Sequence, residues 1–226
     1  MSYARRGLRA LGVSILAALG LMAVTAGGAQ ASGTFLIAGL AAPWSNVPIV
    51  GEADAPLANQ NRFWILNLNI EVYCHEAAVG GTISSNGHGH AEIKFTTCLV
   101  HPVNSSGELI LEPCQLDSSI LGKTLVLVIL HNSKPYLLFS PLEGKFLFHL
   151  TDTEPCPVPV AGFSGSIVAT VSNPDGDDVT KLISTKGTLA LFTTDKLFYG
   201  KNEVHLDADF YISLSGGHQG LKWGAA

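Results

Sequence analysis

The most regular part of the sequence runs from Leu66 to Val100 and reads LNLNIEVYCHEAAVGGTISSNGHGHAEIKFTTCLV. After the Asn86-Gly87 pair, apolar Ile93 and Phe95 alternate with charged residues. Before it, one side of the alternation is apolar and consists of Leu66, Leu68, Ile70, Val72 and Cys74. A period of two is the side-chain repeat of a strand with one buried and one solvated face. The stretch therefore predicts a β-hairpin, and Asn-Gly is the usual signal for a type I′ turn.

The first 31 residues have the three parts of a secretory signal peptide. Arg5, Arg6 and Arg9 supply positive charge, and the apolar segment 11–26 follows them. Ala29-Gln30-Ala31 fits the small-x-small pattern, so we expect cleavage after Ala31 and secretion into the periplasm or the medium. The alternative is an uncleaved anchor. The apolar segment is shorter than the roughly 20 residues of a spanning helix, so we expect no stable membrane span after cleavage.

The exported part of the chain is acidic. Cleavage would leave 10 Lys and Arg residues against 18 Asp and Glu residues, a formal net charge of −8. Nucleic acids and anionic membrane surfaces attract clusters of Lys and Arg, so we expect neither as a partner. The remaining length suits one domain. We divide the chain into a signal peptide (1–31), an irregular proline-containing segment (32–61) and a single β domain (62–226).

The β domain is predicted from many short apolar runs separated by turn residues. Residues 124–130 are apolar on both faces, which favours a strand in the middle of the fold. Residues 204–214 alternate, with Asp207 and Asp209 on the solvated side. We therefore predict an all-β fold, an antiparallel sandwich or closed barrel of about eight to eleven strands.

Four cysteines follow the signal peptide, and an even number in an oxidising compartment implies two disulfides. The alternation places Cys74 with the apolar residues of the first run. It places Cys98 with the charged residues of the second run, on the solvated face. Because residues on opposite faces cannot bond, we predict the pairs Cys74–Cys156 and Cys98–Cys114.

Two histidines form the best candidate for a chemical site. His88 and His90 lie about 7 Å apart on one strand face, a spacing at which both can bind Zn²⁺ or Cu²⁺. A third ligand is required, and four residues would qualify if their strands were neighbours: Glu92, His205, Asp207 and Asp209. The simpler interpretation is a solvated pair beside a turn, because histidine needs no metal on a solvated face.

Other chemistry has weaker signals. Asp175, Asp177 and Asp178 form an acidic turn that resembles a Ca²⁺ loop, but Ser184 stands where a bidentate Glu is needed. Residues 162–166 resemble a nucleophile elbow but lack its second glycine. The sequence contains no phosphate loop and no dinucleotide fingerprint. A hydrolase is therefore the least favoured hypothesis.

Several short motifs accompany the signal peptide: a strand ending in Cys74, Phe95-Thr96-Thr97-Cys98, Pro155-Cys156-Pro157 and Trp223-Gly224. In these features the chain resembles a loose group of uncharacterised secreted bacterial all-β proteins with four cysteines. The resemblance covers most of the chain after the signal peptide. It implies an exported, disulfide-bonded all-β protein, and it assigns no activity or residue role.

These observations predict an exported, non-enzymatic structural or binding protein of unknown ligand. The alternative is a secreted metal-binding protein that holds Zn or Cu with His88 and His90, and no other cofactor is expected. An outer-membrane barrel is less favoured, because 8% aromatic residues leave few for two interfacial girdles.

Overall fold

The computed structural model describes residues 33–41, 43–53, 61–102, 104, 113–116, 119–150, 156, 162–172, 181–184 and 196–226. For residues 172 and 181–184 it describes the backbone only. The predicted signal peptide and the acidic turn at residues 175–178 lie outside the described residues.

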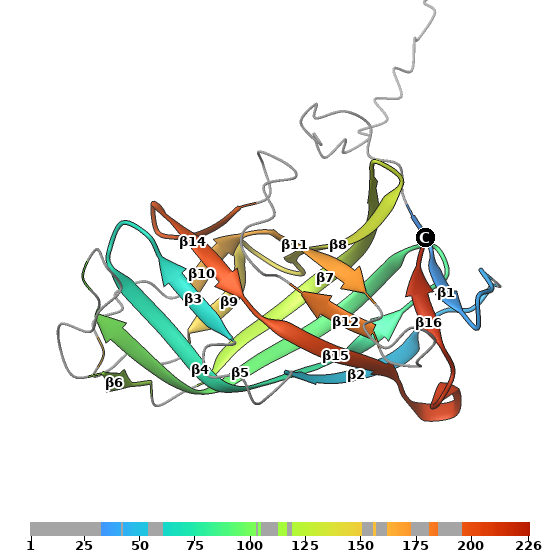
Figure 1. Ribbon diagram of the computed structural model, residues 1–226, viewed down its shortest axis with the longest axis horizontal. Helices are drawn as coiled ribbons and strands as arrows, with labels where there is room; N and C mark the ends of the chain where they lie inside the picture. The colour runs from blue at the N-terminus through green and yellow to red at the C-terminus, as the bar shows by residue number, and fades with distance from the viewer. Residues whose placement is uncertain are drawn as a thin grey trace, which may run out of the picture.

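Eight antiparallel strands close into a barrel, which is one of the two architectures predicted from the sequence (Figure 1). The ring closes because each strand pairs with the next and the last pairs with the first. In the order of the ring they are β2 (Val47–Ala53), β15 (Asp209–Leu214), β12 (Lys181–Ser184), β11 (Ile167–Ser172), β8 (Lys134–Pro141), β7 (Ile120–His131), β5 (His88–Pro102) and β4 (Ile70–Ile83).

The long strands β4, β5 and β7 extend beyond this ring and take part in a second set of pairings. Five shorter strands join them there: β9 (Phe146–Leu150), β10 (Gly162–Gly165), β13 (Leu197–Tyr199), β14 (Asn202–Asp207) and β3 (Arg62–Ile65). The two-residue strand β6 (Cys114–Gln115) adds to β5. We call the end of the barrel with these five strands the aromatic half, and the end with β2, β8, β11, β12 and β15 the cavity half (Figure 1).

The aromatic half is filled by phenylalanine rings. Phe63 lies at the centre, with ring centroids 5.0 Å from Phe95, 5.5 Å from Phe148 and 4.7 Å from Phe163. All four side chains are fully buried. Aromatic pairs at such distances add about 0.5–1.5 kcal/mol beyond the burial of their area, so this cluster is a main source of stability in the aromatic half.

The cavity half is closed by a separate two-stranded sheet made of β1 (Phe35–Ile37) and β16 (Trp223–Ala225), which we call the plug. The plug lies at one end of the barrel, at the right in Figure 1. The Trp223 indole N–H donates a hydrogen bond to the Ile212 carbonyl at 2.9 Å. The Gly33 N–H donates to the Val128 carbonyl at 3.0 Å. These bonds attach the plug to β15 and β7.

Two local differences from the sequence-based expectation bear on the site. Residues 32–61 were expected to be irregular, but they contain β1 and β2, and β2 is part of the barrel. Val47 and Ile49 are buried on alternate positions of β2, and a proline near the start of a strand is compatible with this pairing. The irregular assignment was therefore wrong.

The predicted hairpin between β4 and β5 is present, but its turn is not type I′. The Gly87 N–H donates to the Ser84 carbonyl at 3.1 Å, and the Ser84 N–H donates to the His88 carbonyl at 2.9 Å. Gly87 has a φ of 78°, whereas Asn86 does not have a positive φ. This is the three-residue loop in which a type I turn is followed by a left-handed glycine.

Candidate functional site

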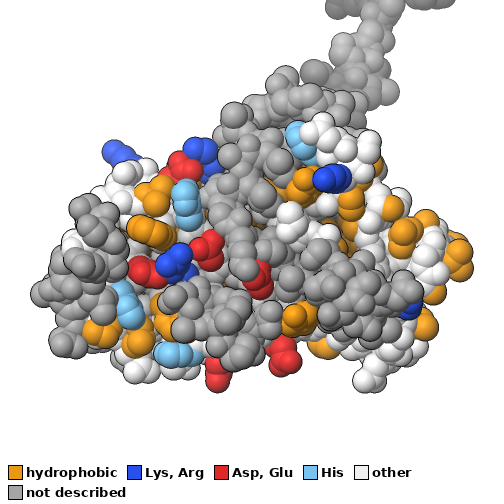
Figure 2. Space-filling view, in the orientation of Figure 1, with side chains coloured by type: hydrophobic (Ala, Val, Ile, Leu, Met, Phe, Trp, Pro, Cys, Tyr) orange, Lys and Arg blue, Asp and Glu red, His pale blue; other side chains and the backbone are white. Residues whose placement is uncertain are grey.

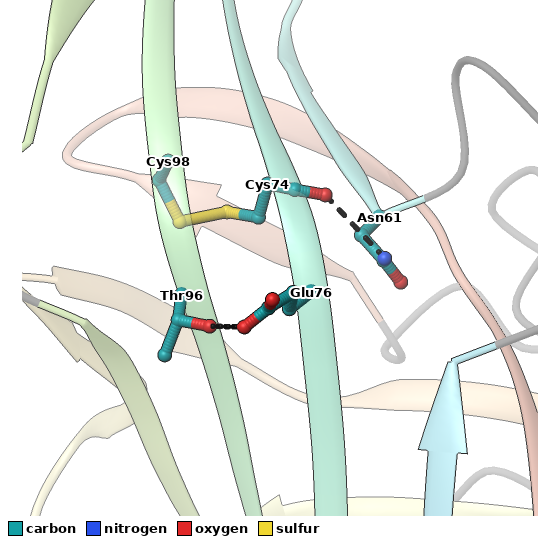
Figure 3. The surroundings of a disulfide bond; sticks show 5 residues. All are labelled: Asn61, Cys74, Glu76, Thr96 and Cys98. Atoms are coloured by element: carbon teal, nitrogen blue, oxygen red, sulfur yellow. Dashed lines mark hydrogen bonds between the residues drawn. A yellow bond between two sulfur atoms is a disulfide. The ribbon is translucent and has the colours of Figure 1, made fainter. Parts of the chain in front are cut away.

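The predicted disulfide pairs, Cys74–Cys156 and Cys98–Cys114, are wrong. Cys74 bonds to Cys98 between β4 and β5, where the two residues face each other directly with their Cα atoms 4.0 Å apart (Figure 3). Cys114 bonds to Cys156, with a Cα–Cα distance of 5.6 Å. The second bond joins β6 to the chain between β9 and β10, so both disulfides lie in the aromatic half.

The error comes from a change of face that occurs in both strands at the same level. In the segments Cys74–Ala77 and Phe95–Cys98 the first and last residues are buried and the two between them are not. Thr97 has a φ of 53°, which allows the local reversal of β5. Because the two interruptions lie opposite each other, the strand register stays unchanged across them. Both cysteines therefore point into the barrel, and both are fully buried.

His88 and His90 share the strand face that the sequence predicted, but no third ligand joins them among the described residues. His88 and His90 are exposed on the outer face of β5, whose neighbours are β4, β6 and β7. Of the other candidate ligands, Glu92 faces Lys123 of β7, and His205 lies on β14, a neighbour of β3 and β13. Within the described part of the chain, no group of three His, Cys, Asp or Glu residues is arranged to hold a metal ion.

The two aspartates expected to share a solvated face are also separated. Strand β14 ends at Asp207 and β15 begins at Asp209, with Ala208 between them. Asp207 therefore pairs with a residue of β3, and Asp209 pairs with a residue of β12. Asp209 is only 3% exposed. The expectation of two adjacent solvated carboxylates was therefore wrong.

A set of polar and aromatic side chains lies on the outer face of β3, β4 and β14. The strand register arranges them in two rows of three: His205, Trp64 and Glu71 in one row, and Asp207, Arg62 and Tyr73 in the other. We call these six residues the Arg62 face. Their buried neighbours on the same strands, such as Phe63 and Val72, belong to the aromatic core, so the alternation holds this face outward.

Arg62 organises this face. Its guanidinium lies 3.1 Å from the Asp207 carboxylate and 3.3 Å from the Glu71 carboxylate, and it sits 5.4 Å from the centre of the Trp64 ring. Partial burial lowers the pKa of Arg62, but the hydrogen bond to Asp207 and the charges of Glu71 and Asp207 outweigh it, so the pKa is raised. The arginine is therefore charged and held between fixed partners, with 26% of its side chain exposed.

This face was not predicted, because the alternation from Leu66 to Cys74 indicates one continuous strand. Residues 63–74 form instead the hairpin of β3 and β4, with a turn over residues 66–69 in which Asn69 has a φ of 52°. The turn brings Arg62 opposite Tyr73. A signal was present in the sequence, since asparagine tolerates left-handed turn positions and two of the four turn residues are asparagine.

A second outer feature is a groove of about 350 Å³ that is lined by residues of β2, β4 and β5. Glu52, His75, Glu76, Lys94 and Thr96 contribute to its wall. The Thr96 hydroxyl donates to the Glu76 carboxylate at 3.0 Å, directly beside the Cys74–Cys98 bond (Figure 3). Carboxylates, lysine and histidine are mixed in this wall, so it does not favour one sign of charge.

The space-filling view shows Lys and Arg, Asp and Glu, and His side chains close together over the region of β3 and β14 (Figure 2). Comparison with known proteins adds no assignment, because no family model, no curated protein and no solved structure matches this chain. A helix long and apolar enough to cross a membrane does not occur among the described residues. The functional argument therefore rests on the geometry of the barrel.

Proposed function

We propose that the protein is an exported, non-enzymatic binding protein, stabilised by two disulfides, whose contact surface for a partner protein is the Arg62 face. The observation that carries this proposal is the ordered display of Trp64, Tyr73 and Arg62 on adjacent strands. Tryptophan, tyrosine and arginine are the residue types that contribute most to binding energy in protein interfaces. Side chains held by a rigid sheet lose little conformational entropy on binding.

The arrangement of charges favours binding over acid–base catalysis. Arg62 engages both Glu71 and Asp207, so each carboxylate already has a cationic partner. Both carboxylates are therefore held in one ion-pair network around Arg62. A partner that covers this face would remove the Arg62 cluster from water and strengthen its electrostatic interactions.

A site-specific crosslinking experiment tests this proposal. A photoreactive amino acid at position 64 is expected to capture a partner protein from the envelope or medium of the source organism. The same amino acid at position 136, on the outer face of β8 in the cavity half, is the control. The captured partner is then purified, and its Kd is measured against Trp64→Ala and Tyr136→Ala.

We expect Trp64→Ala to weaken binding about tenfold or more, since loss of a central aromatic contact costs about 2 kcal/mol. Tyr136→Ala should leave the Kd within about twofold. Equal effects of the two substitutions, or a partner captured only at position 136, would contradict the proposal.

The second candidate function is metal binding at His88 and His90, which share the outer face of β5. Metal analysis of protein purified without a histidine tag tests it. Stoichiometric Zn or Cu that is lost in the His88→Ala, His90→Ala double variant would support this function. Protein that contains no metal, and takes up none during dialysis against Zn or Cu, would contradict metal binding at His88 and His90.

A further inference from the structure

The two disulfides differ in how deeply they are buried. Cys74 and Cys98 are both fully buried. Cys114 is half-buried and lies between the exposed residues Pro113 and Gln115, whereas its partner Cys156 is 7% exposed. A disulfide is reduced by a thiolate that must reach one of its sulfur atoms. Cys114 is therefore the disulfide-bonded cysteine that a thiolate in solution reaches most easily.

The strands that carry the two bonds differ in the same direction. Cys74–Cys98 lies within the pairing of β4 with β5, which extends from one end of β4 to the other. Cys114 belongs to β6, which has only two residue pairs with β5. Local opening requires the least free energy where the fewest contacts are broken. Access to Cys114 thus requires little opening, and access to Cys74 requires the separation of two long strands.

A hydrogen-bond acceptor already lies beside the second disulfide. The Gln115 carbonyl oxygen is 3.2 Å from Cys156 Sγ and 3.9 Å from Cys114 Sγ. A thiol is a weak hydrogen-bond donor, whereas a disulfide sulfur carries no hydrogen. Reduction would therefore give the Cys156 thiol a hydrogen bond that the oxidised form lacks. A disulfide is reduced more readily when its reduced form is stabilised in this way.

We propose that Cys114–Cys156 is a thiol-exchange site, which a dithiol reduces in the folded protein, and that its reduction loosens β6. One thiolate of the dithiol attacks Cys114 Sγ, a new S–S bond forms, and Cys156 leaves as a thiolate that takes a proton from water. The second thiolate of the dithiol then attacks the mixed disulfide and releases Cys114, which is protonated in turn. Two electrons pass to the protein, and the dithiol becomes a disulfide.

The structural consequence of this reaction is confined to one strand. The bond is the covalent link between β6 and the chain between β9 and β10. After reduction, β6 is held by its two pairs with β5 and by the hydrogen bond from the Leu116 N–H to the Cys98 carbonyl. Cys74–Cys98 stays closed and keeps β4 joined to β5. The proposal goes beyond the Arg62 face, because neither Cys114 nor Cys156 belongs to that face.

Alkylation under native conditions tests the proposal. The folded protein is incubated with dithiothreitol, or with reduced thioredoxin as a protein dithiol, and new thiols are alkylated and located by peptide mapping. We expect Cys114 and Cys156 to be labelled at least about a hundredfold faster than Cys74 and Cys98. In guanidinium chloride the two rates should agree within about threefold, because both bonds are then exposed to the reductant.

The two reductants distinguish the sources of the dithiol. Reduction by dithiothreitol alone would identify a small dithiol as the co-reactant, and reduction by both reagents would extend the site to protein dithiols. Circular dichroism verifies that the protein stays folded during labelling. Equal rates for the two bonds in the folded protein, or no labelling of Cys114 before the protein unfolds, would overturn the proposal.

Hydrogen exchange tests the consequence for β6. In protein reduced only at Cys114–Cys156, the Leu116 amide should exchange faster, and reoxidation with oxidised glutathione should restore the original rate. The amide of Val79, within the pairing of β4 with β5, is the control and should keep its rate. Unchanged exchange at Leu116 would contradict the loosening of β6. Trp64→Ala should not change the labelling rates, which separates this result from the test of the Arg62 face.

Discussion

The aromatic half and the cavity half are built on the same long strands, β4, β5 and β7, but their interiors are filled differently. In the aromatic half, three phenylalanine rings surround Phe63, and both disulfides connect neighbouring segments. In the cavity half, a cavity of about 30 Å³ remains beside the plug, and its wall contains aromatic side chains such as Phe35 and Phe210 together with smaller ones such as Ala91 and Val126. The plug that closes this end is held by packing and hydrogen bonds alone.

The difference shows that two halves of one barrel can be filled in different ways. The halves share β4, β5 and β7 but differ in their other strands, so each interior is packed by its own set of side chains. An unfilled interior costs stability, roughly 24 cal/mol for each Å³ of cavity. We infer that the crosslinked aromatic half supplies the stability that the cavity half lacks, and three predictions test this comparison.

Phe63→Ala should have the largest effect, a loss of about 4–5 kcal/mol in the free energy of unfolding, because a void would open between three other rings. Phe139→Ala is the matched change in the cavity half, where the side chain already borders the cavity. We expect a loss of about 3 kcal/mol for that variant. Urea unfolding measures both, and the reverse order would contradict the proposed difference between the halves.

Removal of the second disulfide, by Cys114→Ala together with Cys156→Ala, should cost roughly 3–4 kcal/mol in the chain-entropy model. The bond spans 42 residues, and its loss releases β6 from the chain between β9 and β10. Hydrogen exchange should therefore increase more in β9 and β10 than in β2 and β15. Equal increases in both halves would mean that the barrel responds as one unit, and the comparison would fail.

Gly87→Ala should have the smallest effect, about 1–2 kcal/mol, and it should act on the plug. Gly87 has a φ of 78°, and a Cβ atom there would clash with the Gly33 carbonyl oxygen, where the chain enters β1. Faster amide exchange in Phe35–Ile37 measures the loosening. Gly144→Ala is the control, since Gly144 also has a positive φ but has open space around its Cα. If Gly87→Ala and Gly144→Ala show the same rate of amide exchange in β1, Gly87 has no role in holding the plug against the barrel.

The extent to which the sequence predicted the molecule can be judged from particular residues. The all-β class and the hairpin around Asn86-Gly87 followed from alternation and turn chemistry, and both are confirmed. The hairpin at residues 66–69 was missed because its apolar residues continue the same period through the turn. The Arg62 face depends on that hairpin, so it could not be predicted once the turn was overlooked.

The sequence by itself determined that this chain forms amphipathic strands, because the alternation of apolar and polar residues is a property of neighbours along the chain. Only the tertiary structure decided which residues share a face after an interruption. The stretch from Leu66 to Val100 contains such a change at Thr97 and opposite it in β4, and it turns Cys98 toward Cys74. Such a change exchanges the two faces of a strand from that residue onward. The pairing with the neighbouring strand determines which residues then face the core.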